Sequence, residues 1–285
     1  MSFSVLNNIS ALEAENQLGI TQNSLQKTLF QLSSGSRINS GADDAAGLAI
    51  ANGLQANIVG LTQSIQNANS GVGALQVSDG ALAQVTTLLN RAVTLATEAG
   101  TGTVSAPQQT SLDNEYQSIL TEIDSIGTNT TYNGQAVFTN TTTSIFLSDA
   151  TTVGTSTISV ATGALSTTTL GLNGTLLQDV AGGSGTDAAV GATNAQAALT
   201  KIDAAIQTVA NQRGNIGAGI NQLQAASNVI TAQVQNLTSA EDGITAANIP
   251  QVVGNLTQYE ILAQTGISAL AQANTQQQLV LNLLR

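Results

Sequence analysis

The side chains in this chain that could do chemistry are carboxylates and two lysines. Its 285 residues include 17 Asp and Glu but no His and no Cys. This composition excludes Cys/His zinc sites, Ser-His-Asp triads, thiol nucleophiles and the usual haem ligands. Lys27 and Lys201 could act as catalytic amines, but ion pairing is the better interpretation of both. We therefore expect neither an enzyme nor a bound cofactor.

Two patterns of acidic residues could hold a metal ion, and both have a simpler interpretation. Asp43 and Asp44 stand directly before a run that begins at Ala45. Carboxylates there accept hydrogen bonds from the free N–H groups of a helix start, so we interpret both as helix caps. The stretch Gly182–Asp187 matches the start of a calcium-binding nonapeptide, a motif that works in tandem arrays. A single copy is interpreted as a turn, and no metal site is expected.

The charge balance excludes further classes of partner. Six Lys and Arg against 17 acids give a formal net charge of −11. Scattered cations cannot neutralise a phosphate backbone, so nucleic acid is not expected as a partner. The first residues lack the basic and apolar regions of a secretory signal, and Gln or Asn interrupts the charge-free run Ala45–Ser78 too often for a membrane span. With only 8% charged residues, much of the surface suits burial against copies of the chain.

Heptad spacing predicts two long helices far apart in the sequence. Residues of the run Leu54–Ala96 step 4-3-4-3, and eleven of its thirteen seam positions are apolar. The same step recurs over Leu199–Ile244, where eleven of fourteen are apolar. Asp79 is an exception in the first run and Arg213 in the second. Such spacing is typical of a coiled-coil seam, so we expect these helices to pair antiparallel.

A third helix and a small β-region are expected between the long helices. Ser105 and Pro107 signal the start of a helix, and Gly127 signals its end. From about 128 to 195 the sequence is rich in Thr, Ser and Gly. Asn133-Gly134 predicts a hairpin turn, and Ser144–Leu147 and Thr157–Val160 are β-prone runs. We expect hairpins and loops in this segment.

The two ends of the chain also show helical spacing, but with few stabilising features. Alone, each terminal helix would be marginal in water, and Pro250 is expected to break or restart the helix before the last one. The predicted fold is therefore mainly α: a long antiparallel coiled-coil-like bundle, paired terminal helices and a small β-hairpin region in the middle.

Several stretches resemble the signatures of bacterial flagellin. The first two are Leu32–Ser40 (LSSGSRINS) and Asp43–Ala51 (DDAAGLAIA). The others are Gly60–Gln63, Leu262–Asn274 (LAQTGISALAQAN) and Val280–Arg285 (VLNLLR). The match covers nearly the whole chain, and its long paired motifs are specific to that family.

The resemblance implies a structural subunit that self-assembles into the bacterial flagellar filament for motility. It implies export in an unfolded state without a cleaved signal and polymerisation at the filament tip, outside the cell. Residues 1–42 and 246–285 would form an inner core domain that lines the filament channel. Residues 43–245 would form the outer core, with the hairpin region at about 128–195. There is no room for larger outer domains.

The resemblance also implies partners and contact residues. The partners would be other copies of the chain, an export chaperone, the filament cap and the hook-junction proteins. Self-assembly is assigned to apolar residues of the terminal helices: Leu18, Leu25, Leu29, Leu32, Leu256, Tyr259, Ile267, Leu270, Leu279, Leu281 and Leu284.

A host receptor is a further partner implied by the resemblance. Arg91 and Leu95 flank Val93 on the seam and share a face by i, i+4 spacing, so both are expected to point away from the seam. With Glu115 they match positions at which flagellins contact a Toll-like receptor, although Val93 and Thr94 stand where that motif often carries charges. A contact between filament subunits through the same face is the alternative.

Two other functions remain open. A flagellin-like protein at the hook–filament junction shares the terminal helices but is present in few copies. A monomeric secreted adhesin or immune ligand would have folded, protease-resistant termini, whereas a filament subunit would order its termini only on polymerisation.

Overall fold

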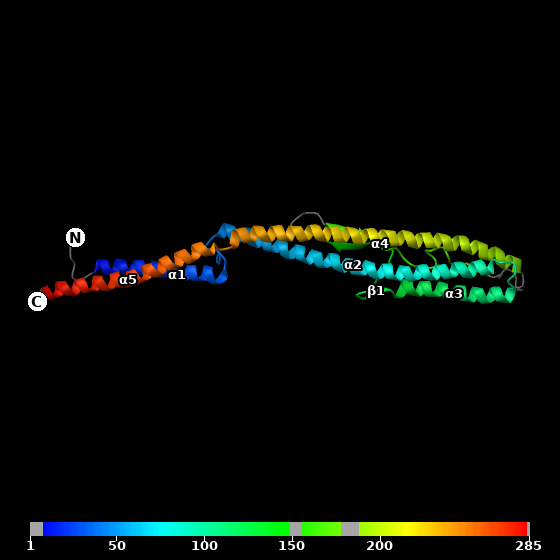
Figure 1. Ribbon diagram of the computed structural model, residues 1–285, viewed down its shortest axis with the longest axis horizontal. Helices are drawn as coiled ribbons and strands as arrows, with labels where there is room; N and C mark the ends of the chain where they lie inside the picture. Colours follow the sequence, from blue (N-terminus) through cyan, green and yellow to red (C-terminus); the bar gives the residue numbers. More distant parts are fainter. Residues whose placement is uncertain (1–7, 149–155, 178–187, 284–285) are drawn as a thin grey trace. The chain divides into compact units, whose positions relative to one another are not determined.

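The computed structural model describes residues 8–148, 156–177 and 188–283 (Figure 1). Within these ranges the chain is mainly helical, as predicted. The helices are α1 (Ile9–Ser34), α2 (Ala45–Ala99), α3 (Ala106–Asn129), α4 (Ala188–Thr245) and α5 (Ile249–Leu283). The strands are β1 (Thr131–Tyr132), β2 (Gln135–Ala136), β3 (Thr143–Phe146) and β4 (Thr157–Val160). No helix in the described ranges has the apolar length that crossing a bilayer requires.

The chain divides into two compact units. We call residues 1–58 with 235–285 the terminal unit, and residues 59–234 the middle unit. The terminal unit contains α1, α5 and the ends of α2 and α4 that adjoin them. The middle unit contains α3, the strands and the larger parts of α2 and α4.

In the terminal unit, α1 and α5 lie antiparallel (Figure 1). The Asn8 side chain accepts a hydrogen bond from the Ala11 N–H at 3.1 Å and so caps the start of α1. The Asn8 Nδ2 also donates to the Ala273 carbonyl at 3.0 Å, which joins the two helices. Gly35, in the left-handed conformation with φ of 68°, ends α1. The prediction of paired terminal helices is confirmed.

In the middle unit, α2 and α4 pair antiparallel through the predicted seam. Every seventh residue of each seam is buried: Leu61, Ala68, Leu75, Leu82, Leu89 and Ala96 on α2, and Ala195, Ile202, Val209, Ile216, Leu223 and Ile230 on α4. As residue numbers rise along α2, the partners on α4 have falling numbers. The neighbouring pairs are Gly71 with Leu223, Leu75 with Gly219, Asp79 with Arg213, and Gly100 with Ala195. This is the packing that heptad spacing predicts.

The helix α3 covers a second face of α2 (Figure 1). It starts after Ser105, as predicted, and the Gln108 Oε1 accepts from the Ser105 N–H at 3.0 Å, which is part of a capping box. The sequence predicted that this helix ends at Gly127, but it continues to Asn129. The backbone of Gly127 is buried against the Leu165 carbonyl, where a Cβ would not fit. This glycine therefore allows a close approach within a helix and does not end it.

The β-region forms two short hairpins. The turn between β1 and β2 is Asn133-Gly134, with φ values of 50° and 76°, as predicted. In the second hairpin, β3 pairs antiparallel with β4. Its Ile145 side chain lies over Gly71 of α2, and its Val160 side chain lies over Gly219 of α4. These two glycines leave the space in which the hairpin is seated on the helices.

The segment before α4 is held by acidic side chains of α3. Asp124 accepts from the Thr167 N–H at 2.7 Å and the Thr167 hydroxyl at 2.9 Å. The buried Asp113 accepts from the Leu177 N–H at 2.7 Å. Residues 188–195, which the sequence assigned to the loop region, are already part of α4. The stretch Gly182–Asp187, interpreted as a turn, lies outside the described residues.

Candidate assembly surface

The terminal unit has a short backbone ladder where α1 ends and α4 ends. Ser36 and Ala246 form an antiparallel bridge. The Arg37 N–H donates to the Thr245 carbonyl at 2.7 Å, and the Ala247 N–H donates to the Gly35 carbonyl at 2.9 Å. Carbonyls at the end of α4, which lack partners within the helix, are thereby satisfied by a segment that is distant in the sequence.

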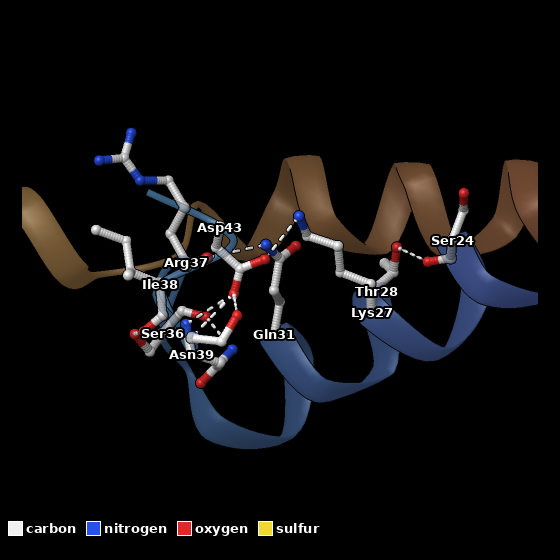
Figure 2. Close-up of polar contacts among 10 residues, drawn as sticks. Ser24, Lys27, Thr28, Gln31, Ser36, Arg37, Ile38, Asn39 and Asp43 are labelled. Atoms are coloured by element: carbon white, nitrogen blue, oxygen red, sulfur yellow. Dashed lines mark hydrogen bonds and ion pairs between the residues drawn. The ribbon is translucent and has the colours of Figure 1, made fainter. Parts of the chain in front are cut away.

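Arg37 strengthens this ladder with its side chain. Its Nη2 donates to the Ile244 carbonyl at 2.9 Å, a favourable position for a cation because the C-terminal end of α4 carries partial negative charge. The Gln31 Nε2 donates to the Arg37 carbonyl at 3.0 Å from the last turn of α1 (Figure 2). The loop after α1 is therefore held from both helices.

An ion pair fixes the same loop to the side of α1. The Lys27 Nζ lies 2.7 Å from the Asp43 Oδ1, as Figure 2 shows. The Asp43 Oδ2 accepts from the Asn39 N–H at 3.1 Å and from the Ser40 N–H at 3.0 Å. The Lys27 ammonium and these donors lower the pKa of Asp43 to about 2.

The two adjacent aspartates therefore do different things. Asp44 caps α2, because its Oδ1 accepts from the Gly47 N–H at 2.8 Å. Asp43 instead accepts hydrogen bonds from the backbone of the preceding loop and forms an ion pair with Lys27 of α1. The helix-cap interpretation is confirmed for Asp44 and wrong for Asp43. The ion-pair interpretation of Lys27 is confirmed, whereas Lys201 donates to the Thr175 hydroxyl at 3.5 Å.

The hollow beside this ion pair has a volume of about 280 Å³. It is lined by Lys27, Gln31, Arg37, Ile38, Asp43 and Asp44. Among the described residues there is no group of three or more acidic side chains placed to hold a metal ion. The polar groups here bond to one another and to backbone, so the arrangement is a brace that holds the loop after α1 to α1 and to the end of α4.

Apolar side chains are unusually exposed along the terminal pair. On α1 they are Ile9, Leu12, Ile20, Leu29 and Phe30, and on α5 they are Ile249, Val253, Ile261, Leu262 and Ile267. Their exposed fractions run from 41% at Ile249 to 70% at Phe30. Large apolar side chains left exposed in this number on two paired helices indicate an interaction site. We call these ten residues the terminal surface.

The predicted self-assembly residues fall into three groups. Two of them, Leu29 and Ile267, belong to the terminal surface. Six are half-buried: Leu18, Leu25, Leu32, Leu256, Tyr259 and Leu270. Leu18 lies against Gly266, so this second group includes a contact that joins α1 to α5. The side chains of Leu279, Leu281 and Leu284 lie outside the described residues.

Sequence reasoning missed most of the terminal surface. It followed the apolar stripe of each terminal helix, and six of the residues that it named are half-buried, including Leu18, which lies against Gly266 of α5. Ile20 and Phe30 lie off that stripe and are 59% and 70% exposed. The presence of large apolar residues outside the apolar stripe of a terminal helix was the signal from which they could have been predicted.

The residues matched to a receptor contact lie in the middle unit. Arg91 of α2 forms an ion pair with Glu115 of α3, with Nη2 and Oε1 2.7 Å apart. Both side chains are about half exposed. Leu95, in contrast, is completely buried. Leu95 therefore has no exposed side chain with which to contact another molecule, because α3 gives this part of α2 a second buried face.

The two ends of the chain are both similar to known proteins. Residues 5–143 match the bacterial flagellin N-terminal helical region, and residues 199–284 match the bacterial flagellin C-terminal helical region. The flagellin of Halalkalibacterium halodurans is 33% identical, with 98% of each chain covered. The flagellar filament 33 kDa core protein of Treponema phagedenis is 32% identical with the same coverage. The crystal structure of Bacillus cereus flagellin is 31% identical, covers 62% of this chain and 94% of that one, and has a TM-score of 0.47.

Proposed function

This chain belongs to the bacterial flagellin family and is a structural subunit of the flagellar filament, and we propose that it polymerises chiefly through the terminal surface. The observation that carries the proposal is the exposure of ten large apolar side chains on α1 and α5. A single copy leaves these side chains in water, and neighbouring copies would remove them from it. The expected gain is roughly 25 cal/mol for each Å² of apolar surface buried.

The terminal surface suits an open polymer. It lies on elongated helices, and a head-to-tail contact between unlike faces of identical subunits extends without closing. The contacts of Arg37, Lys27 and Asp43 would hold the end of α1 and the loop after it against the end of α4 while the surface is being buried. Assembly would therefore order a region that is marginal in the monomer.

We further propose the division into domains that the family suggests. Residues 1–42 and 246–285 would form the inner core and residues 43–245 the outer core. The bridge between Ser36 and Ala246 lies close to this boundary and supports it. The boundary between the compact units differs from this division, because it falls after Ile58 in α2 and before Gln235 in α4. Residues 45–58 and 235–245 would then belong to the outer core but lie in the terminal unit.

The remaining assignments follow from family membership. We propose that the chain is exported through the flagellar system, polymerises outside the cell at the filament tip, and meets an export chaperone, the filament cap and hook-junction proteins. We propose no catalytic activity, which is consistent with a sequence that lacks His and Cys.

Recognition by an innate immune receptor is a second proposal. Arg91 and Glu115 would form the polar part of the contact, since both are about half exposed. Leu95, completely buried, would shape the surface from beneath. A receptor reporter assay with Arg91→Ala tests this: an unchanged response at equal protein concentration would refute the contact.

Seeded polymerisation tests the main proposal. Ile20→Asn and Val229→Asn are matched variants, because both native side chains are 59% exposed, one in the terminal unit and one in the middle unit. With filament seeds added, light scattering and electron microscopy should show polymerisation strongly reduced for Ile20→Asn and largely retained for Val229→Asn. Equal effects of the two variants would contradict an assembly surface centred on α1 and α5. The copy number in isolated filaments distinguishes a main subunit from a junction protein.

A further inference from the structure

The long seam between α2 and α4 poses a problem of alignment. Its buried positions repeat every seven residues with similar side chains, among them Leu75, Leu82 and Leu89 on α2 and Ile202, Ile216 and Ile230 on α4. If one helix moved by seven residues, most of these contacts would be replaced by equivalent ones. Apolar packing alone therefore discriminates weakly between alignments that differ by one heptad.

Within the middle unit, two charged residues interrupt this seam, one on each helix, and they meet. Asp79 lies between the buried Leu75 and Leu82, and Arg213 lies between the buried Val209 and Ile216. The Arg213 Nε is 2.8 Å from the Asp79 Oδ1, and its Nη2 is 3.2 Å from the Oδ2. This two-pronged geometry is the specific form of an arginine–carboxylate contact.

We propose that the contact between Asp79 and Arg213 fixes the alignment of α2 with α4. A shift of one heptad would place Asp79 opposite Ile206 or Ile220, and it would place Arg213 opposite Val72 or Thr86. Each charge would then face an uncharged side chain, and the two-pronged contact would be lost. Because the side chains of Asp79 and Arg213 are 39% and 40% exposed, this loss is smaller than at a fully buried site. The pair therefore contributes more to choosing one alignment than to stability, as polar residues at seam positions do in coiled coils.

The hairpin of β3 and β4 is the competing device. Its Ile145 and Val160 side chains are seated over Gly71 and Gly219, one on each helix. If these seats fix the alignment, the ion pair is dispensable. The two explanations differ in what happens when the pair is replaced by apolar residues, which leaves the hairpin and its seats unchanged.

Engineered disulfides can report the alignment, because the natural chain has no Cys. A Cβ at Gly100 would lie 3.8 Å from the Cβ of Ala195, within the range that a disulfide requires. Gly100→Cys with Ala195→Cys therefore reports the native alignment. Gly100→Cys with Ile202→Cys, and Val93→Cys with Ala195→Cys, report shifts of one heptad in the two directions.

Each reporter is placed in the full chain, and disulfide formation is followed by gel mobility under mild oxidation. With Asp79 and Arg213 present, we expect the native reporter alone to close. In the background Asp79→Leu with Arg213→Leu, no charged seam position remains in the middle unit, so the chain should fold with undiminished thermal stability. At least one shifted reporter should then close about tenfold faster than in the natural background.

Two controls make the result specific. The ion pair Arg91–Glu115 has the same length but joins α2 to α3, so Arg91→Leu with Glu115→Leu should leave all three reporters unchanged. The exchange Asp79→Arg with Arg213→Asp should restore closure of the native reporter alone. If the Leu/Leu background still closes only the native reporter, the seated hairpin sets the alignment and the proposal is overturned. If the charge exchange closes a shifted reporter, the ion pair does not specify the alignment, which also overturns the proposal.

Discussion

The terminal unit and the middle unit contain similar apolar amino acids but differ in how many of these side chains they bury. In the middle unit, α2 has α4 on one face and α3 on another, and Leu82, Leu89 and Leu95 are completely buried. In the terminal unit, α1 has α5 beside it, and large side chains such as Phe30 remain in water. A helix with two neighbours buries apolar side chains on two faces, whereas a helix with one neighbour keeps more of them exposed for another molecule. The difference lies in how many faces the rest of the chain covers.

The largest expected effect is on assembly. Deletion of Leu279–Arg285 should abolish filament formation, because this apolar stretch carries three of the predicted self-assembly residues, Leu279, Leu281 and Leu284. Thermal unfolding of the middle unit should be unchanged. Seeded polymerisation and circular dichroism measure the two effects, and normal filaments from the truncated chain would show that the end of the chain is dispensable.

A matched pair of Leu→Ala variants compares the two units directly. Leu89→Ala should lower the free energy of unfolding by about 2 to 5 kcal/mol, because it leaves a cavity in a complete core. Leu25→Ala, at a half-buried position of α1, should cost about 1 kcal/mol or less. Chemical denaturation of monomers measures both. Similar losses would mean that the terminal pair is as tightly packed as the middle unit.

Alkaline pH should weaken the middle unit through Tyr116. Burial of this side chain raises its pKa from 10.0 to about 12. In the unfolded chain the phenol ionises near pH 10, while in the folded chain it stays protonated, so stability is complete below pH 10 and falls as the pH rises toward 12. The loss should be about 2 to 3 kcal/mol. Tyr116→Phe should remove this part of the pH dependence, and an unchanged alkaline profile would contradict it.

The smallest expected effect is at the brace of the terminal unit. The pKa of Asp43 is lowered to about 2 by Lys27, so its contribution is fully present above about pH 4 and is lost as the pH falls toward 2. Hydrogen exchange at the last turn of α1 should quicken over this interval. Asp43→Asn should show faster exchange at neutral pH and lose the acid dependence, with Asp44→Asn as the comparison that affects the start of α2.

Sequence reasoning succeeded where spacing and local chemistry decide the structure. The heptad steps predicted α2 and α4, Ser105 with Pro107 predicted the start of α3, and Asn133-Gly134 predicted a turn. It failed where a residue far away in the sequence decides. Glycine is typical of a helix end, but at Gly127 it allows the Leu165 carbonyl to approach the helix closely. An aspartate before a helix is typical of a cap, but Asp43 forms an ion pair with Lys27 of α1 and does not cap α2.

By itself, the sequence determined that this chain forms long helices with one apolar seam, because periodicity is a property of consecutive residues. It also carried the family signatures at both ends. Only the tertiary structure decided which seam residues have a second neighbour and which apolar residues are left over. Leu95 is buried because α3 lies against α2, and Phe30 is exposed because no third helix of the described chain covers α1 there. Burial depends on everything that surrounds a side chain, and a linear pattern records only the helix that carries it.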